Sequence, residues 1–351
     1  HVMGALLIAL AGFASAWSHR NHGNRPLGGL LFAWGLWWWV ATLWQEIGRA
    51  PVDATDFRMV LVIATGWIAS EVHRRMPAKV LAWAAMASLF AALPFAFAQD
   101  QAHGYPLAAH GWIAWALYMA AGWRMLDNPR GEDVAPAAHV GWWLSLALLA
   151  SLSLHHVAGA GSGEPGLGDG WRWALGGLPW LCLAAVLQWR GRWIVAPRAT
   201  AETAWRRDLH GLVVGVVACG WLLALDEPGD AAPLAWVAAA NPLDLAQLAA
   251  LALVAAWLHG TGAGARWVQS RDRILAVGVF GLATVMVLRG CHHWGGVGWG
   301  LSMFDTGLVQ AALTVAWSLL GVGGWILGSR RGHRALWLAG AVLMGVVLAK
   351  L

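Results

Sequence analysis

The sequence predicts an all-α protein, a polytopic integral membrane bundle of about twelve transmembrane helices. The first observation is composition, since hydrophobic residues make up 59% of the chain and charged residues only 12%. A soluble domain has about 45–50% apolar and about 25% charged residues. So few polar side chains could not cover a soluble protein of this length, whereas lipid solvates apolar surfaces directly.

The second observation is a series of long apolar segments. About 20 apolar residues span the hydrocarbon layer, and twelve segments approach that length. They are Val2–Trp17, Leu27–Ile47, Phe57–Val72, Ala78–Ala98, Leu107–Met125, Pro136–His156, Trp171–Trp189, Leu209–Leu225, Pro242–His259, Arg273–Leu288, Asp305–Leu327 and Ala335–Leu351.

The third observation is the position of the basic residues. Of the 23 lysines and arginines, 18 lie on odd-numbered connections, and the acidic residues favour the even-numbered ones. Basic loops stay in the cytoplasm. We therefore expect a bacterial inner (cytoplasmic) membrane protein, with the Arg190–Asp208 loop cytoplasmic and the Arg289–Phe304 loop periplasmic. Orientation accounts for the net charge of +5, so membrane lipids are the expected partners and nucleic acid is not.

The chain contains no visible internal repeat or linker, so residues 1–351 are expected to form a single transmembrane helical domain. The start at His1 and the end at Leu351, without a polar tail, suggest a piece of a longer polytopic protein. The glycine-rich stretch Gly159–Gly170 lacks the spacing of a phosphate-binding loop. Three widely separated cysteines, at positions 182, 219 and 291, support neither a disulfide framework nor a zinc site.

The candidate site lies between the tenth and eleventh segments. It combines a cation, two imidazoles, an indole and polar groups entering the next helix: Arg289, His292, His293, Trp294, Asp305, Gln310 and Trp317. Polar groups at membrane depth are costly, so they are paired or functional. Arg289 could hold an anionic headgroup, Trp294 could stack on a sugar, and the histidines could form hydrogen bonds or transfer protons. In the alternative interpretation Arg289 and Trp294 are interfacial anchors and Asp305 caps a helix.

Further histidines occur as the adjacent pair His155-His156, with His103 and His110 near them in the predicted topology. A metal site is not expected, because neighbouring helical residues point about 100° apart and the HExxH spacing is absent. No cofactor is expected either. Adjacent histidines of this kind more often mark helix ends, where an imidazole tolerates half-burial.

Two other motifs have structural and functional interpretations. Asn241-Pro242-Leu243-Asp244 reads as a helix start, with Asn241 as N-cap, proline in the first turn and Asp244 facing the positive end of the helix dipole. The chain is also tryptophan-rich, with 28 tryptophans, and five of them crowd one segment at positions 34, 37, 38, 39 and 44. These five could pack between helices or line a groove for a lipid or sugar.

The C-terminal region resembles a family of bacterial predicted membrane proteins, domain of unknown function 2339. The resemblance is most specific over Arg273–Leu351. It rests on the arginine followed by His292-His293-Trp294, on the helix with Gln310 and Trp317, and on the basic turn before Trp337. It implies a match to the carboxy-terminal part of long polytopic proteins and assigns no activity. In family members Lys350-Leu351 continues into further helices; Lys350 here would snorkel or pair with a carboxylate.

Three classes of function remain open. The favoured one is a non-enzymatic protein that binds or moves an envelope lipid, glycan or glycolipid at the periplasmic leaflet. The others are a membrane-embedded transferase or hydrolase acting on a lipid-linked substrate and a non-catalytic envelope scaffold. The lack of carboxylates at a recognisable catalytic spacing argues against the enzyme.

The alternation of charge makes a direct prediction about topology. In a variant without the native cysteines, Arg206→Cys is expected to be protected from a membrane-impermeant maleimide in whole cells, and His293→Cys is expected to react. Labelling of both positions from the same side would contradict the predicted arrangement.

Overall fold

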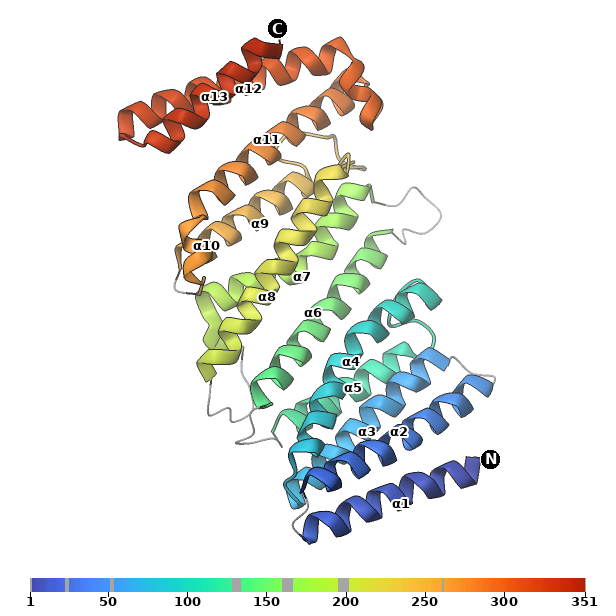
Figure 1. The fold of residues 1–351 in the computed structure, drawn as a ribbon. Coiled ribbons are helices and arrows are strands. Elements are labelled where there is room, and N and C mark those ends of the chain that lie inside the picture. The colour runs from blue at the N-terminus through green and yellow to red at the C-terminus, as the bar shows by residue number, and fades with distance from the viewer. Residues whose placement is uncertain are drawn as a thin grey trace. The chain divides into compact units, whose positions relative to one another are not determined.

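The chain is seen in a computed structural model that describes residues 2–22, 25–50, 54–127, 134–159, 167–194, 202–260 and 262–350. Over these ranges the backbone is α-helical or 3₁₀-helical with short connecting turns, and it contains no strand (Figure 1). An all-α architecture is therefore confirmed. Part of the Gly159–Gly170 stretch, part of the Arg190–Asp208 loop and the terminal Leu351 lie outside the described residues.

The described residues fall into two compact units. Unit 1 is made of His1–Val157 with Cys182–Val213, and unit 2 of Ala158–Leu181 with Val214–Leu351. Within this part of the chain the helices before the division are α1 (Val2–Asn21), α2 (Arg25–Arg49), α3 (Ala54–Arg75), α4 (Lys79–His103), α5 (Gly111–Leu126) and α6 (Ala135–Gly159). The later ones are α7 (Asp169–Arg190), α8 (Glu202–Leu223), α9 (Pro242–His259), α10 (Ala265–Gln269), α11 (Arg271–Gly295), α12 (Gly307–Arg331) and α13 (Arg334–Lys350). Three 3₁₀ turns are η1 (Gly191–Trp193), η2 (Ala224–Asp226) and η3 (Leu301–Asp305).

Each of the twelve apolar segments coincides with one of these helices, and α10 is an additional short helix. Eight of the helices in the described ranges are long and apolar enough to cross a membrane. A helical membrane bundle is thus confirmed, while the figure of twelve spans stays a prediction.

Three predicted helix starts are wrong by several residues. The helix expected from Leu209 already begins at Glu202. The segment expected from Leu107 becomes helical only at Gly111, because turns occupy the residues just before it. The segment expected from Asp305 starts at Gly307, with Thr306 at the N-cap position. Asp305 closes the turn η3 instead, so its interpretation as the N-cap is wrong.

Small residues let neighbouring helices approach closely. Helices α12 and α13 pack side by side in unit 2 (Figure 1). A Cβ atom added at Gly340 would lie 2.6 Å from the carbonyl oxygen of Gly321. Backbone contact of this kind is how helices associate in lipid, where no hydrophobic force drives them together.

This contact makes Gly340→Ala a test of the hairpin. The methyl group would force α13 away from α12, at a cost of about 1–3 kcal/mol in stability. Gly345→Ala is the matched control on the same helix, since a Cβ there meets no atom within 4 Å. Thermal unfolding of the purified proteins in detergent is expected to show a lower midpoint for Gly340→Ala only; equal midpoints would contradict the packing.

Candidate functional site

The candidate site begins in the last turns of α11, which runs further than the sequence suggested. The helix was expected to end at Leu288, with Arg289–Phe304 as a loop, but it continues to Gly295. It ends where Gly296 adopts a left-handed conformation, with φ of 65°, and donates its N–H to the carbonyl of Cys291. The helix can pass through Arg289 because internal acceptors satisfy the guanidinium.

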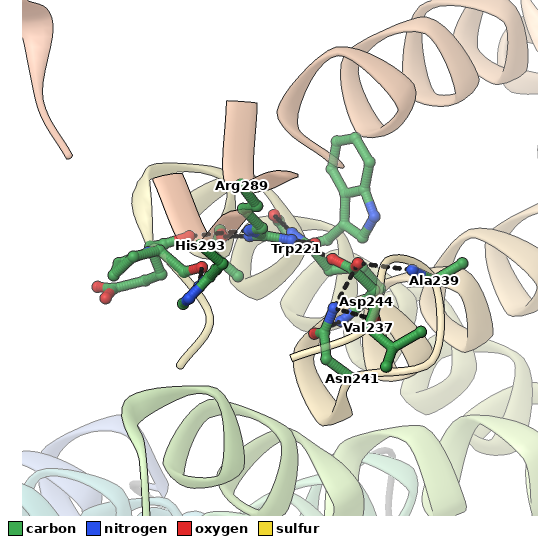
Figure 2. A network of polar contacts seen from close by, with 11 residues as sticks. Trp221, Val237, Ala239, Asn241, Asp244, Arg289 and His293 are labelled. Carbon is green, nitrogen blue, oxygen red and sulfur yellow. Dashed lines mark hydrogen bonds and ion pairs between the residues drawn. The ribbon is translucent and has the colours of Figure 1, made fainter. Parts of the chain in front are cut away.

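Arg289 is completely buried and makes four hydrogen bonds. Nη1 donates to Oδ1 of Asp244 at 2.5 Å and to Oε1 of Gln247 at 2.7 Å. Nη2 donates to the carbonyl of Ala224 at 2.7 Å, and Nε donates to the carbonyl of Glu227 at 2.9 Å. We call these five residues the Arg289 network. It ties the end of α11 to the start of α9 and to the turn η2 (Figure 2).

The carboxylate of Asp244 is held equally firmly from its other side. Its second oxygen, Oδ2, accepts from Nδ2 of Asn241 at 2.5 Å and from the backbone N–H of Ala239 at 3.0 Å (Figure 2). Asn241 caps α9 through its Oδ1, which accepts from the N–H of Asp244, and Pro242 lies in the first turn. The predicted helix start is therefore confirmed. Sequence reasoning missed the second role of Asp244, as partner of the arginine.

No local pattern could have revealed this pair, because Asp244 and Arg289 are 45 residues apart. The usable signal was energetic: an arginine inside an apolar segment needs a carboxylate partner. Removing one partner of such a pair leaves a buried charge unpaired, which costs far more than losing an exposed ion pair. The network is therefore expected to stabilise the fold.

Beside the network lies a cluster of rings that we call the aromatic face, made of Trp236, His293 and Trp294. Nε2 of His293 bonds the carbonyl of Pro228 at 2.9 Å. The ring of Trp236 stacks on His293 with centroids 4.8 Å apart and meets Trp294 edge-on at 5.1 Å. Trp236 is buried, while Trp294 is 68% exposed. The cluster thus presents one indole outward on a fixed base.

The neighbouring His292 has a structural contact. Its Nδ1 bonds the carbonyl of Val297 at 2.7 Å, and its ring meets Trp299 edge-on. Trp299 in turn donates its indole N–H to the carbonyl of Asp226 at 2.8 Å. His293 and Trp299 therefore hold the end of α11 and the chain after it against the segment that follows α8, while His292 bonds within the turn after α11.

The remaining predicted site residues make other contacts. Gln310 donates through Nε2 to the carbonyl of Phe304 at 2.5 Å, and Trp317 donates to Oγ1 of Thr284 at 3.1 Å. Trp317 thereby joins α12 to α11, and Asp305 is exposed. The structure brings Arg289, His292, His293 and Trp294 together at the end of α11, and it places Asp305, Gln310 and Trp317 on or before α12.

Unit 1 contains a second buried polar network that sequence reasoning missed. Asp56, in the first turn of α3, accepts from Nε2 of Gln99 at 2.7 Å and from the backbone N–H of His110 at 3.1 Å. Oε1 of Gln99 accepts from the indole of Trp115 at 2.8 Å, and Nε2 of His103 lies 3.8 Å from Asp56. Asp56 and Gln99 are both buried. In the sequence, the predicted proximity of His103 and His110 was the one indication of this network.

The other histidine pair also has an aromatic neighbour, since His156 stacks on Tyr105 with centroids 4.3 Å apart. Within the described ranges, no group of three histidines, cysteines or acidic residues is placed to hold a metal ion.

Taken together, the apolar helices and their buried ion pair define a multi-pass helical membrane protein. The chain belongs to the family described as predicted membrane protein DUF2339, whose family model matches residues 2–351. This match extends the resemblance seen from Arg273 onward to essentially the whole chain. No curated protein and no solved structure matched the sequence in these comparisons.

The Arg289 network predicts a large stability difference between two arginine substitutions. Arg289→Met leaves Asp244 buried without its cation and is expected to cost about 3–5 kcal/mol. Arg49→Met is the control, because Arg49 forms an exposed ion pair with Glu46, and such pairs contribute about 0–1 kcal/mol. Membrane abundance and thermal unfolding are the measurements.

The double variant Asp244→Leu with Arg289→Met is expected to recover much of that loss, since it removes both charges. If Arg289→Met were as stable as the Arg49 control, the pair would have no structural role.

Proposed function

We propose that this protein binds, and in doing so can move, an envelope lipid or glycolipid at one face of a bacterial inner membrane, without catalysing a reaction. The observation that carries the proposal is the aromatic face. There an indole that is 68% exposed packs edge-on against the buried ring of Trp236, which stacks on the half-buried His293. An exposed, rigid aromatic ring offers an apolar surface for a sugar ring or a lipid backbone, while its N–H stays available for hydrogen bonding.

The exposed apolar side chains that follow Trp294 in the chain support a contact at the boundary between water and lipid. Leu301 is 89% exposed, and Phe304, in the same turn η3, is also exposed. Tryptophan and other amphipathic rings concentrate at the level of lipid headgroups. In the topology predicted from the basic loops, this face lies in the periplasm.

The hydrogen bonds of Arg289 support a change in its role within the proposal. Its guanidinium is buried and donates to four oxygen atoms of the Arg289 network, two from side chains and two from backbone carbonyls. We therefore assign it the role of holding the aromatic face in place. Contact with the lipid falls to Trp294 and His293, which lie within five residues of Arg289 on the same helix.

The hydrogen bonds to the carboxylate of Asp244 favour a binding role over an enzymatic one. Both oxygens of Asp244 accept hydrogen bonds, one from Arg289 and the other from Asn241 and Ala239. A general acid or base needs a group that can reach the substrate and exchange a proton. The network holds the carboxylate of Asp244 in place, with hydrogen bonds to both of its oxygens.

Photo-crosslinking in vesicles tests the proposal. The full chain is reconstituted into phosphatidylethanolamine vesicles containing a diazirine-bearing glycosyl diacylglycerol, or the same diacylglycerol without the sugar. Trp294→Ala is expected to reduce sugar-dependent labelling several-fold while membrane abundance stays unchanged. Trp193→Ala is the matched control, since Trp193 is 65% exposed, and it should label like the parent protein.

Each other outcome has a definite meaning. Equal labelling of the parent protein and Trp294→Ala would contradict a binding role and leave the scaffold interpretation. Release of the sugar or acyl group from the bound probe by the parent protein would establish the enzyme instead.

A further inference from the structure

Unit 1 contains a large apolar pocket between helices α1, α2, α3 and α4. Its volume is about 940 Å³, within the range of roughly 300–1,000 Å³ typical of ligand sites. The wall is built from aromatic and aliphatic side chains, among them Phe13, Trp17, Phe32 and Ile68. A cavity of this character suits a hydrocarbon chain.

Two polar groups in the wall of the pocket satisfy each other. The indole of Trp39 donates its N–H to Oγ1 of Thr65 at 3.2 Å, and both residues line the pocket. Phe13 and Phe32 pack against each other with centroids 5.4 Å apart. A hydrocarbon can therefore fill this part without stripping hydrogen bonds from buried groups.

One rim of the pocket is cationic. Lys79 lines the pocket at the start of α4, after the short turn that follows α3. That turn is fixed, because the backbone N–H of Ala78 donates to Nδ1 of the buried His73 at 3.1 Å. Arg75 is also exposed at the end of α3. A pocket with an apolar interior and a positive rim is complementary to an anionic amphiphile.

We propose that this pocket binds an anionic phospholipid of the surrounding bilayer, with an acyl chain between α1–α2 and α3–α4 and its phosphate facing Lys79. The bilayer supplies this ligand to any pocket between membrane helices, and Lys79 lies at a helix end, the level that headgroups occupy. The inference does not rest on the function proposed for the aromatic face, because the pocket is lined only by residues of unit 1.

Gly29 allows the pocket to be filled without harm to the fold. It lines the pocket, and a Cβ added there meets no atom within 4 Å. A leucine at this position projects into the open space and also favours the helix. Gly4 on α1 is the matched control, since a Cβ there is equally unobstructed and the residue does not line the pocket.

The test uses the full chain in phosphatidylethanolamine vesicles that contain a small fraction of phosphatidylglycerol with a diazirine in its acyl chain. After irradiation, labelled peptides are mapped by mass spectrometry. Labelling of α1–α4 peptides is expected to fall several-fold in Gly29→Leu and to stay unchanged in Gly4→Leu. Equal labelling in both variants, or label spread evenly over all the apolar helices, would overturn the proposal.

Lys79→Gln tests the headgroup separately. It is expected to reduce the preference for phosphatidylglycerol over a phosphatidylethanolamine probe about fivefold, the effect of one cation near an anionic surface. Arg331→Gln, an exposed cation at the end of α12, is the control. An unchanged preference in Lys79→Gln would refute the anionic specificity. A crosslinked dimer lost in Gly29→Leu would show that a second copy fills the pocket and would also refute the proposal.

Discussion

A buried ion pair between Arg289 and Asp244 determines how the ends of several helices in unit 2 meet. In an apolar interior neither charge is tolerable alone, and the attraction compensates for desolvation only when the remaining hydrogen-bonding positions are also filled. Gln247, Asn241 and backbone groups supply those bonds. Satisfying both charges therefore fixes the start of α9, the end of α11 and the turn η2 in one arrangement. Because His293 and Trp294 follow Arg289 on α11, this arrangement also holds the aromatic face in place.

Unit 1 meets a related constraint with a different set of side chains. In both units a carboxylate in the first turn of a helix accepts a backbone N–H and bonds a partner near the end of a later helix. The partner is Gln99, 43 residues after Asp56, in one unit and Arg289, 45 residues after Asp244, in the other. The hydrogen-bond partner of the carboxylate is thus a neutral amide in unit 1, with the imidazole of His103 3.8 Å away, and a guanidinium in unit 2. In each network the carboxylate also accepts a backbone N–H near a helix end, from His110 or from Ala239, and such groups would otherwise lack a partner.

The two proposed lipid contacts differ in chemistry. The aromatic face offers a single exposed indole on a rigid base and suits a headgroup or sugar. The pocket of unit 1 encloses about 940 Å³ of mainly apolar space beside Lys79 and suits a hydrocarbon chain with an anionic end. The crowding of tryptophans on α2 has a mixed outcome: Trp39 lines the pocket, whereas Trp34 and Trp37 are exposed on the helix surface. One helix thus carries both a tryptophan that lines the pocket and tryptophans that are exposed on its surface.

The sequence by itself determined the class of protein, the position of the helices and the cap at Asn241, because apolar length and capping are local properties of the chain. It also identified the turn of α11 that holds Arg289, His293 and Trp294. Only the tertiary structure decided that Arg289 pairs with Asp244, that Trp236 supports Trp294, and that Asp305 lies outside the network. Those relations join residues far apart in sequence, and their energies depend on burial, which no local pattern of residues encodes.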